Sequence, residues 1–168
     1  MLAAIVLRAL QLIVSGVVLG LSIYLAHNYG YGHAVAQIRY GAFCGAFGLL
    51  VSFFGIAATF LDVLQGMVMS MIDALAALLI LAGGITFAVS AQIGSCSDQY
   101  YVASRQIFRV GLYYHQSMKA SQYLKLLESR CRMVQADTTF LWILFACFVA
   151  TAVLGLAGGR SKGRGSFV

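Results

Sequence analysis

The sequence predicts an all-helical membrane protein in which four transmembrane helices form an antiparallel bundle, with one long loop that contains interfacial helix. Two observations support this prediction. Hydrophobic residues make up 61% of the 168-residue chain and charged residues only 10%, whereas a soluble domain averages about a quarter charged residues. Four stretches are also long and apolar enough to cross about 30 Å of hydrocarbon, and the chain contains no proline.

The four predicted spans cover residues 2–26, 40–61, 66–93 and 133–157, and they form a single domain over residues 1–157. The first span contains Arg8 within its apolar run and is not followed by a small-residue cleavage site. We therefore expect a retained helix rather than a signal peptide. Residues 62–65 leave room only for a tight turn, which makes the second and third helices antiparallel neighbours. Residues 158–168 form a basic tail.

Residues 94–132 form the one substantial loop. Within residues 100–128, aromatic and aliphatic side chains recur at roughly helical spacing among basic ones. This pattern predicts one or two interfacial helices that lie on the membrane and are broken near Gly111. A loop that folds against the ends of the transmembrane helices is the alternative.

Ionisable residues inside the spans need partners, because each costs about 2.5–3.5 kcal/mol on insertion scales. Arg8 and Asp73 lie at comparable depths from the same end of the bundle, which predicts an ion pair between them. Arg39 and Asp137 lie near the other ends of their helices and are predicted to pair in the same way. A transporter or channel that uses Asp73 is the alternative, although the spans offer that residue no second acid or histidine for a proton relay.

Small residues form a further pattern within the spans, because glycine lets helix backbones approach closely in lipid. We expect these glycines to pack the helices of the bundle, and contact with neighbouring copies or with a sterol ring is the alternative. The candidate packing residues are Gly16, Gly20, Gly41, Gly45, Gly48, Gly83 and Gly84.

Catalytic and ligand-binding signatures do not emerge from the sequence. His27, His33 and His115 fall in predicted loops without the spacing of metal ligands. We find neither a nucleophile motif nor a phosphate-binding glycine loop. We therefore expect neither enzymatic activity nor a cofactor or metal. The net charge of +6 indicates charge flanking a membrane rather than a nucleic-acid partner.

Basic residues and cysteines make opposite predictions about sidedness. Most Lys and Arg residues lie on the side of the long loop, which the positive-inside rule would place in the cytosol. These residues are Arg39, Arg105, Arg109, Lys119, Lys125, Arg130 and Arg132. Cys96 and Cys131 lie at the two ends of that loop, and a bridge between them requires an oxidising compartment. Closing a loop of this length would contribute on the order of 3–4 kcal/mol.

Several stretches, in order, resemble the fungal non-classical-export (eisosome-associated) tetraspan proteins of the MARVEL-domain superfamily. They are "YGAFCGAFG", "IDALAALLILAGGITFAV", "SCSDQYYVAS", "RCRMVQADTTFLWILFACFVATAVL" and "GRGSF". The resemblance covers nearly the whole chain. It implies a plasma-membrane protein with cytosolic termini and an extracellular loop, in which Cys96 and Cys131 face the exterior.

The resemblance also implies a non-enzymatic role in organising lateral membrane microdomains. Such a protein would associate with itself as an oligomer or lateral array, with sterol and sphingolipid, and with a cortical scaffold protein. The tail residues Arg160, Lys162 and Arg164 would contact anionic lipids of the inner leaflet, at about 1 kcal/mol per charge. A trafficking or export adaptor is the alternative function.

Overall fold

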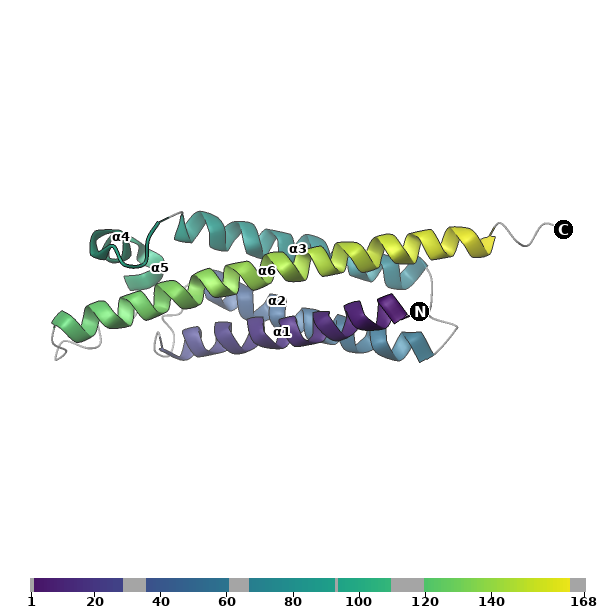
Figure 1. Cartoon of the computed structure of the whole chain (residues 1–168), viewed down its shortest axis with the longest axis horizontal. Helices are drawn as coiled ribbons and strands as arrows, with labels where there is room; N and C mark the ends of the chain where they lie inside the picture. The colour runs from purple at the N-terminus through teal and green to yellow at the C-terminus, as the bar shows by residue number, and fades with distance from the viewer. Residues whose placement is uncertain (1, 29–35, 61–66, 93, 110–119, 164–168) are drawn as a thin grey trace.

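The computed structural model describes residues 2–28, 36–60, 67–92, 94–109 and 120–163. Four long helices, α1 (Leu2–Asn28), α2 (Ala36–Phe60), α3 (Met67–Ala91) and α6 (Ala120–Gly163), make up most of this part of the chain. Two short helices, α4 (Gln99–Ser104) and α5 (Gln106–Arg109), lie beside one end of the bundle, and the start of α1 and the end of α6 lie toward the other (Figure 1). These ends are named the loop end and the terminal end.

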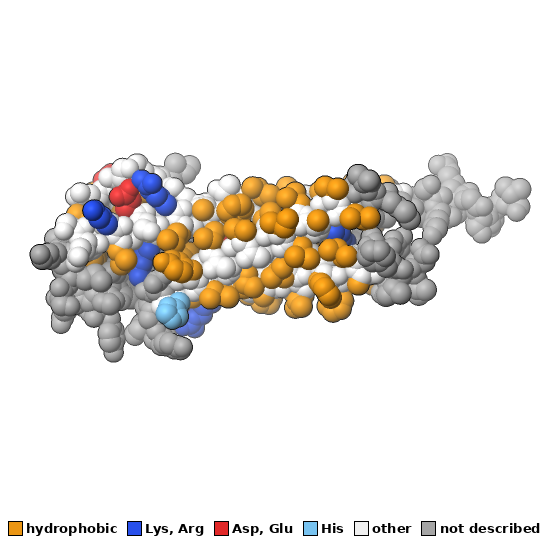
Figure 2. Space-filling model, turned by 60° about the horizontal axis from the view of Figure 1, so that its bottom comes forward, with side chains coloured by type: hydrophobic (Ala, Val, Ile, Leu, Met, Phe, Trp, Pro, Cys, Tyr) orange, Lys and Arg blue, Asp and Glu red, His pale blue; other side chains and the backbone are white. Residues whose placement is uncertain are grey.

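Each of the four long helices contains a stretch that is long and apolar enough to span a membrane. The stretches are Ala4–His27, Ala36–Ala58, Val68–Ala91 and Ser121–Ala157. On the face drawn in Figure 2, hydrophobic side chains cover the middle of the bundle, while acidic and most basic side chains gather toward the loop end. The prediction of a four-span helical membrane bundle is confirmed.

Helix α6 is much longer than the predicted fourth span. It begins at Ala120 rather than near residue 133, and it continues to Gly163 through most of the predicted tail. With 44 residues at 1.5 Å each it measures about 66 Å, roughly twice the thickness of the hydrocarbon. Residues 112–154 contain neither glycine nor proline, the two residues that most disfavour a helix, so the helix is not broken where the membrane begins.

The described residues of the long loop fall mostly in three helices. Residues 120–128, which we expected in an interfacial helix, are the first turns of α6, and α4 and α5 pack against α6. The predicted break at Gly111 lies outside the described residues. Helix α4 begins where the Asp98 carboxylate accepts a hydrogen bond from the backbone NH of Tyr100, at 2.9 Å.

The four long helices occupy the corners of the bundle. Helix α1 packs against α2 and α6, and α3 packs against α6 and α2. Helices α1 and α3 therefore stand at opposite corners, as do α2 and α6. The tight turn predicted between α2 and α3 lies outside the described residues, but the two helices are neighbours as predicted.

A seven-residue repeat of buried positions runs along each long helix. In α1 it comprises Arg8, Gln11, Ser15, Val18, Ser22 and Leu25, which alternate in steps of three and four. Such a repeat is typical of helices that wind around one another with a left-handed twist. The buried polar residues of the described chain also occupy these repeats, so polar groups lie along the axis of the bundle among the buried apolar side chains.

Glycines bring α1 and α2 into close contact. A Cβ atom added at Gly45 would lie 2.6 Å from the backbone nitrogen of Leu19, and one added at Gly48 would lie 2.6 Å from the Oγ atom of Ser15. Gly41 likewise faces Ser22, and Gly55 faces Arg8. The spacing of these four glycines follows the repeat, so α2 presents a nearly flat edge to α1.

A glycine of α2 that faces α1 and a glycine of α1 with no neighbour can be compared by substitution with alanine. Gly45→Ala should lower the free energy of unfolding by about 1–3 kcal/mol, because the added methyl group overlaps the α1 backbone. Gly20→Ala should leave stability unchanged or raise it by up to about 1 kcal/mol, because nothing lies within 4 Å of the new Cβ atom. Thermal unfolding in mild detergent measures both. Equal effects of the two substitutions would contradict the close packing of α1 on α2.

Candidate functional site

An ion pair between α1 and α3 lies in the core near the terminal end. The Nη1 and Nη2 atoms of Arg8 donate to the Oδ1 and Oδ2 atoms of Asp73, at 2.7 and 2.5 Å. The two side chains are only 8% and 2% exposed. The structure thus brings together the two residues for which the sequence predicted a pair. Because α1 and α3 stand at opposite corners, the contact crosses the centre of the bundle.

Side chains from the other helices surround this pair. Arg8 also donates to the side-chain oxygen of Gln11 at 3.1 Å, and the Gln11 amide nitrogen donates to the hydroxyl of Thr151 on α6 at 3.0 Å. Gly55 on α2 lies directly against the guanidinium group. All four long helices therefore meet at Arg8. A carboxylate bonded on both oxygens to a guanidinium is suited to joining helices, because the guanidinium balances its charge and donates a hydrogen bond to each oxygen.

Asp137 forms a different contact from the predicted one. Its Oδ2 atom accepts a hydrogen bond from the Ser22 hydroxyl on α1, at 2.8 Å, and the residue is fully buried. The side chain of Arg39 is exposed, and it belongs to α2, at the corner opposite α6. The predicted pair of Arg39 with Asp137 is not seen, because one carboxylate oxygen of Asp137 is bonded to Ser22 and the other has no hydrogen-bond partner among the described residues.

The predicted packing glycines fall into two groups. Five of them face a neighbouring helix: Gly41, Gly45 and Gly48 meet α1, Gly83 meets the thiol of Cys44, and Gly84 meets the ring of Trp142. Gly16 and Gly20 have no atom within 4 Å of the place where a side chain would begin, and both positions are exposed. The structure therefore leaves this pair of glycines on an open lateral face of α1.

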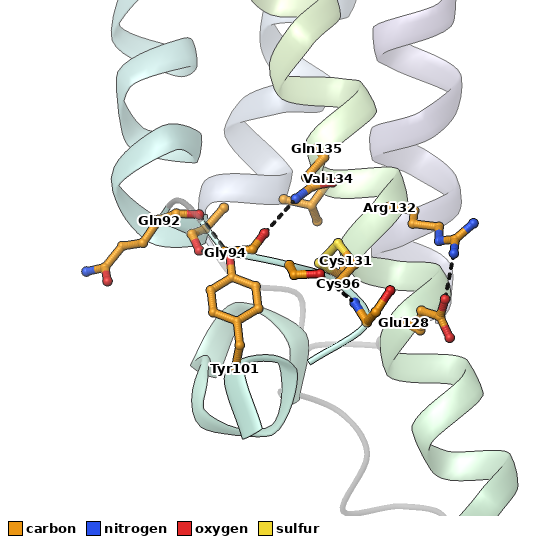
Figure 3. The surroundings of a disulfide bond; sticks show 12 residues. Gln92, Gly94, Cys96, Tyr101, Glu128, Cys131, Arg132, Val134 and Gln135 are labelled. Atoms are coloured by element: carbon orange, nitrogen blue, oxygen red, sulfur yellow. Dashed lines mark hydrogen bonds and ion pairs between the residues drawn. A yellow bond between two sulfur atoms is a disulfide. The ribbon is translucent and has the colours of Figure 1, made fainter. Parts of the chain in front are cut away.

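A disulfide between Cys96 and Cys131 ties the start of the loop to α6 (Figure 3). Cys131 is fully buried, and Cys96 packs against the same core. Beside the bridge, the amide nitrogen of Gln135 donates to the backbone oxygen of Gly94 at 3.3 Å. These contacts hold the segment that leaves α3 against the side of α6.

Tyr101 of α4 closes the end of α3. Its hydroxyl donates to the backbone oxygens of Ala91 and Gln92, two carbonyls that helix termination leaves without intrahelical partners (Figure 3). A Cβ atom at Gly94 would lie 2.2 Å from the Tyr101 ring, so only glycine fits there. Burial raises the pKa of the Tyr101 phenol, and the nearby Arg105 opposes this effect in part. The raised pKa keeps the hydroxyl protonated, so that it can act as a hydrogen-bond donor.

Other predicted site residues lie outside these contacts. Arg160 and Lys162 belong to the last turns of α6, and Arg164 lies outside the described residues. His33 and His115 also fall outside the described part of the chain, whereas His27 lies in the last turn of α1. Among the described residues, no three His, Cys, Asp or Glu side chains come together as metal ligands.

Around Arg8 and Asp137, sequence reasoning missed four residues that build the contacts, namely Gln11, Thr151, Ser22 and Gly55. A signal for two of them was present in the spacing. Ser22 stands fourteen positions after Arg8, two full repeats along α1, and Gly55 stands seven after Gly48. No comparable signal identified Thr151, because a threonine in a transmembrane helix usually bonds to its own backbone. Thr151 also donates to the backbone oxygen of Phe148, at 3.0 Å.

The fold and the contacts define a multi-pass membrane protein whose four-helix bundle is held together by buried polar side chains. The family model for the MARVEL membrane-associating domain matches residues 2–154, and the chain belongs to this family. Members are generally non-enzymatic structural membrane proteins, and membership indicates a tetraspan associated with membrane microdomains.

Comparison with curated proteins finds a fungal relative. The chain is 25% identical to a Non-classical export protein 2 homolog of Schizosaccharomyces pombe over 151 residues, which cover 89% of this chain and 74% of the relative. No solved structure matches the chain.

The buried ion pair leads to a test of what holds the bundle together. Arg8→Met should lower the free energy of unfolding by about 3–5 kcal/mol, because it leaves Asp73 buried without its cation. The double variant Arg8→Met, Asp73→Leu should recover most of that loss. The matched control is Arg132→Met, which breaks an exposed pair with Glu128 and should cost under about 1 kcal/mol.

Thermal unfolding of detergent-purified protein measures all three variants. Similar losses for Arg8→Met and Arg132→Met would show that the core pair contributes no more than a surface pair. A double variant less stable than Arg8→Met alone would show that the loss does not come from burying Asp73 without its cation.

Proposed function

We propose that this protein is a non-enzymatic plasma-membrane tetraspan that organises lateral membrane microdomains of the eisosome type through self-association and lipid binding. Family membership supports the general role, and the open glycine face of α1 is the observation that supports self-association. In this proposal the termini are cytosolic and the long loop is extracellular.

Self-association would use the face of α1 that carries Gly16 and Gly20. Two glycines four residues apart let a second helix approach closely enough to gain packing contacts that lipid tails do not provide. The exposed side chains of Ile13 and Val17 border this face and would supply the apolar contacts. A second copy of this chain is the partner that we propose, with sterol or sphingolipid filling the remaining lateral surface.

Anionic lipids of the inner leaflet would be bound at the terminal end. Arg160 and Lys162 lie on the last turns of α6, and Arg164 follows them in the sequence. Each would contribute about 1 kcal/mol of attraction to a negatively charged leaflet. A cortical scaffold protein is the further partner that the family resemblance suggests for this cytosolic end.

A role as an adaptor for non-classical export is the second candidate. The name of the Schizosaccharomyces pombe relative is the observation that favours it. Transport through Asp73 is less well supported, because both carboxylate oxygens of that residue are bonded to Arg8.

Replacing the two open glycines tests the self-association that the proposal requires. The double variant Gly16→Leu, Gly20→Leu should fold normally but lose lateral clusters, because the leucines hold a second helix away from the α1 backbone. Ala74→Leu, at an exposed position of α3, is the matched control and should cluster like the wild type. Stepwise photobleaching of labelled protein in native-like membrane counts the copies per cluster. Clusters of unchanged size in the double variant would contradict this interface.

Labelling with a membrane-impermeant thiol reagent tests the sidedness. After reduction on intact cells, the half-buried Cys96 should be labelled, because we place the loop outside. A second variant avoids dependence on reduction: Ser97→Cys, combined with Cys96→Ser and Cys131→Ser, carries an exposed thiol at the same place. Labelling that requires permeabilised cells in both proteins would reverse the topology and remove the basis for a cytosolic tail.

A further inference from the structure

Asp137 stands out among the buried polar residues near the loop end of the bundle. It is 0% exposed, and its Oδ2 atom has one hydrogen-bond donor, the Ser22 hydroxyl. Its Oδ1 atom is buried and has no hydrogen-bond partner among the described residues. Ser22 also faces Gly41, which in turn meets the ring of Phe87 near the end of α3. The carboxyl group therefore lies inside the bundle, in a layer to which all four long helices contribute.

The two carboxyl groups of the core differ in their partners. Asp73 is bonded on both oxygens to the guanidinium of Arg8. Asp137 takes part neither in this ion pair nor in the pair of Glu128 with Arg132. A serine hydroxyl carries no charge that could balance a carboxylate. The same bundle thus buries one carboxyl group with a cation and the other without one.

The groups near Asp137 do not supply the missing positive charge. On α1, Arg8 is committed to Asp73 near the terminal end. On α2, Cys44 is a buried free cysteine, and Arg39 is exposed. The described side chain of α3 in this layer is the apolar Phe87.

The remaining candidates come from α6 and the short helices. Arg130 is seven residues from Asp137 on α6, which places its backbone about 10 Å toward the loop end. Arg105, between α4 and α5, stacks over the ring of Tyr101 outside the bundle core. Neither forms an ion pair with Asp137 in the described structure.

Burying an unpaired carboxylate in an apolar bundle is strongly unfavourable, and such a group takes up a proton instead. We propose that Asp137 is a proton-binding site that holds its proton at neutral pH. The 2.8 Å separation from Ser22 suits donation in either direction, so the neutral carboxyl group can donate to the Ser22 hydroxyl oxygen. Ser22 can then donate to the backbone oxygen of Val18, one turn earlier in α1, as helical serines commonly do.

This site is independent of the proposed function, because it lies in the core rather than on the lateral surface. Its ligand is the proton, and the contact that the proton maintains joins α1 to α6 near the loop end. Loss of the proton would place a charge between these helices with only a hydroxyl group beside it.

Infrared spectroscopy of the protein in a detergent without carbonyl groups tests the assignment directly, because the ester carbonyls of phospholipids absorb in the same region. The wild type at neutral pH should show the carbonyl stretching band of a protonated carboxyl group. The chain has only five Asp and Glu residues, which makes the band assignable. Asp137→Asn should abolish the band, and Asp73→Asn, in which the other core carboxyl is replaced, should leave it in place.

Ser22→Ala provides a second measurement, which does not depend on whether Asp137→Asn folds. It removes the hydrogen-bond partner of the carboxyl group, so the band should shift in frequency while remaining present. Absence of the band in the wild type would overturn the proposal. A band that survives Asp137→Asn, or that Ser22→Ala leaves unshifted, would overturn it as well.

Discussion

The ion pair between Arg8 and Asp73 is the interaction on which the arrangement of the bundle depends most. In an apolar membrane neither charge can be left without the other, so the two helices that carry them must remain in register. The pair crosses the diagonal of the bundle, and Gln11 extends it to Thr151 on α6. One buried contact therefore fixes the relative depth of α1, α3 and α6, which neighbouring apolar contacts alone would leave free to slide.

Close approach of the helices makes that contact possible. Arg8 reaches Asp73 because Gly55 leaves space for the guanidinium beside α2, and the other glycines of α2 let α1 lie almost against its backbone. In lipid, packing of this kind replaces the hydrophobic effect as the force between helices. Polar groups along the axis and glycines along one edge thus act together: the glycines set the distance between helices, and the polar groups set their register.

Composition and hydropathy were sufficient to predict the four spans, because burial in lipid requires long apolar helices whatever their packing. The pair of Arg8 and Asp73 could also be predicted, because the two residues lie at comparable depths and each needs a partner. The contact of Asp137 could not be predicted in this way, because it depends on which helices are neighbours in the bundle. The length of α6 was missed for a related reason: hydropathy marks where a helix enters the membrane, whereas only glycine, proline or a cap marks where it ends.

The seven-residue repeat explains why some glycines face inward and others outward. Gly41, Gly48 and Gly55 share one repeat position on α2 and all meet α1, whereas Gly16 and Gly20 fall between the buried positions of α1. Glycine lowers helix stability when nothing packs against it, so an outward pair is a cost unless another surface covers it. The inward glycines are accounted for by the fold of a single chain. The outward pair has no contact within one bundle, and the self-association that we propose would cover it, because a second helix can pack closely only where no side chain intervenes.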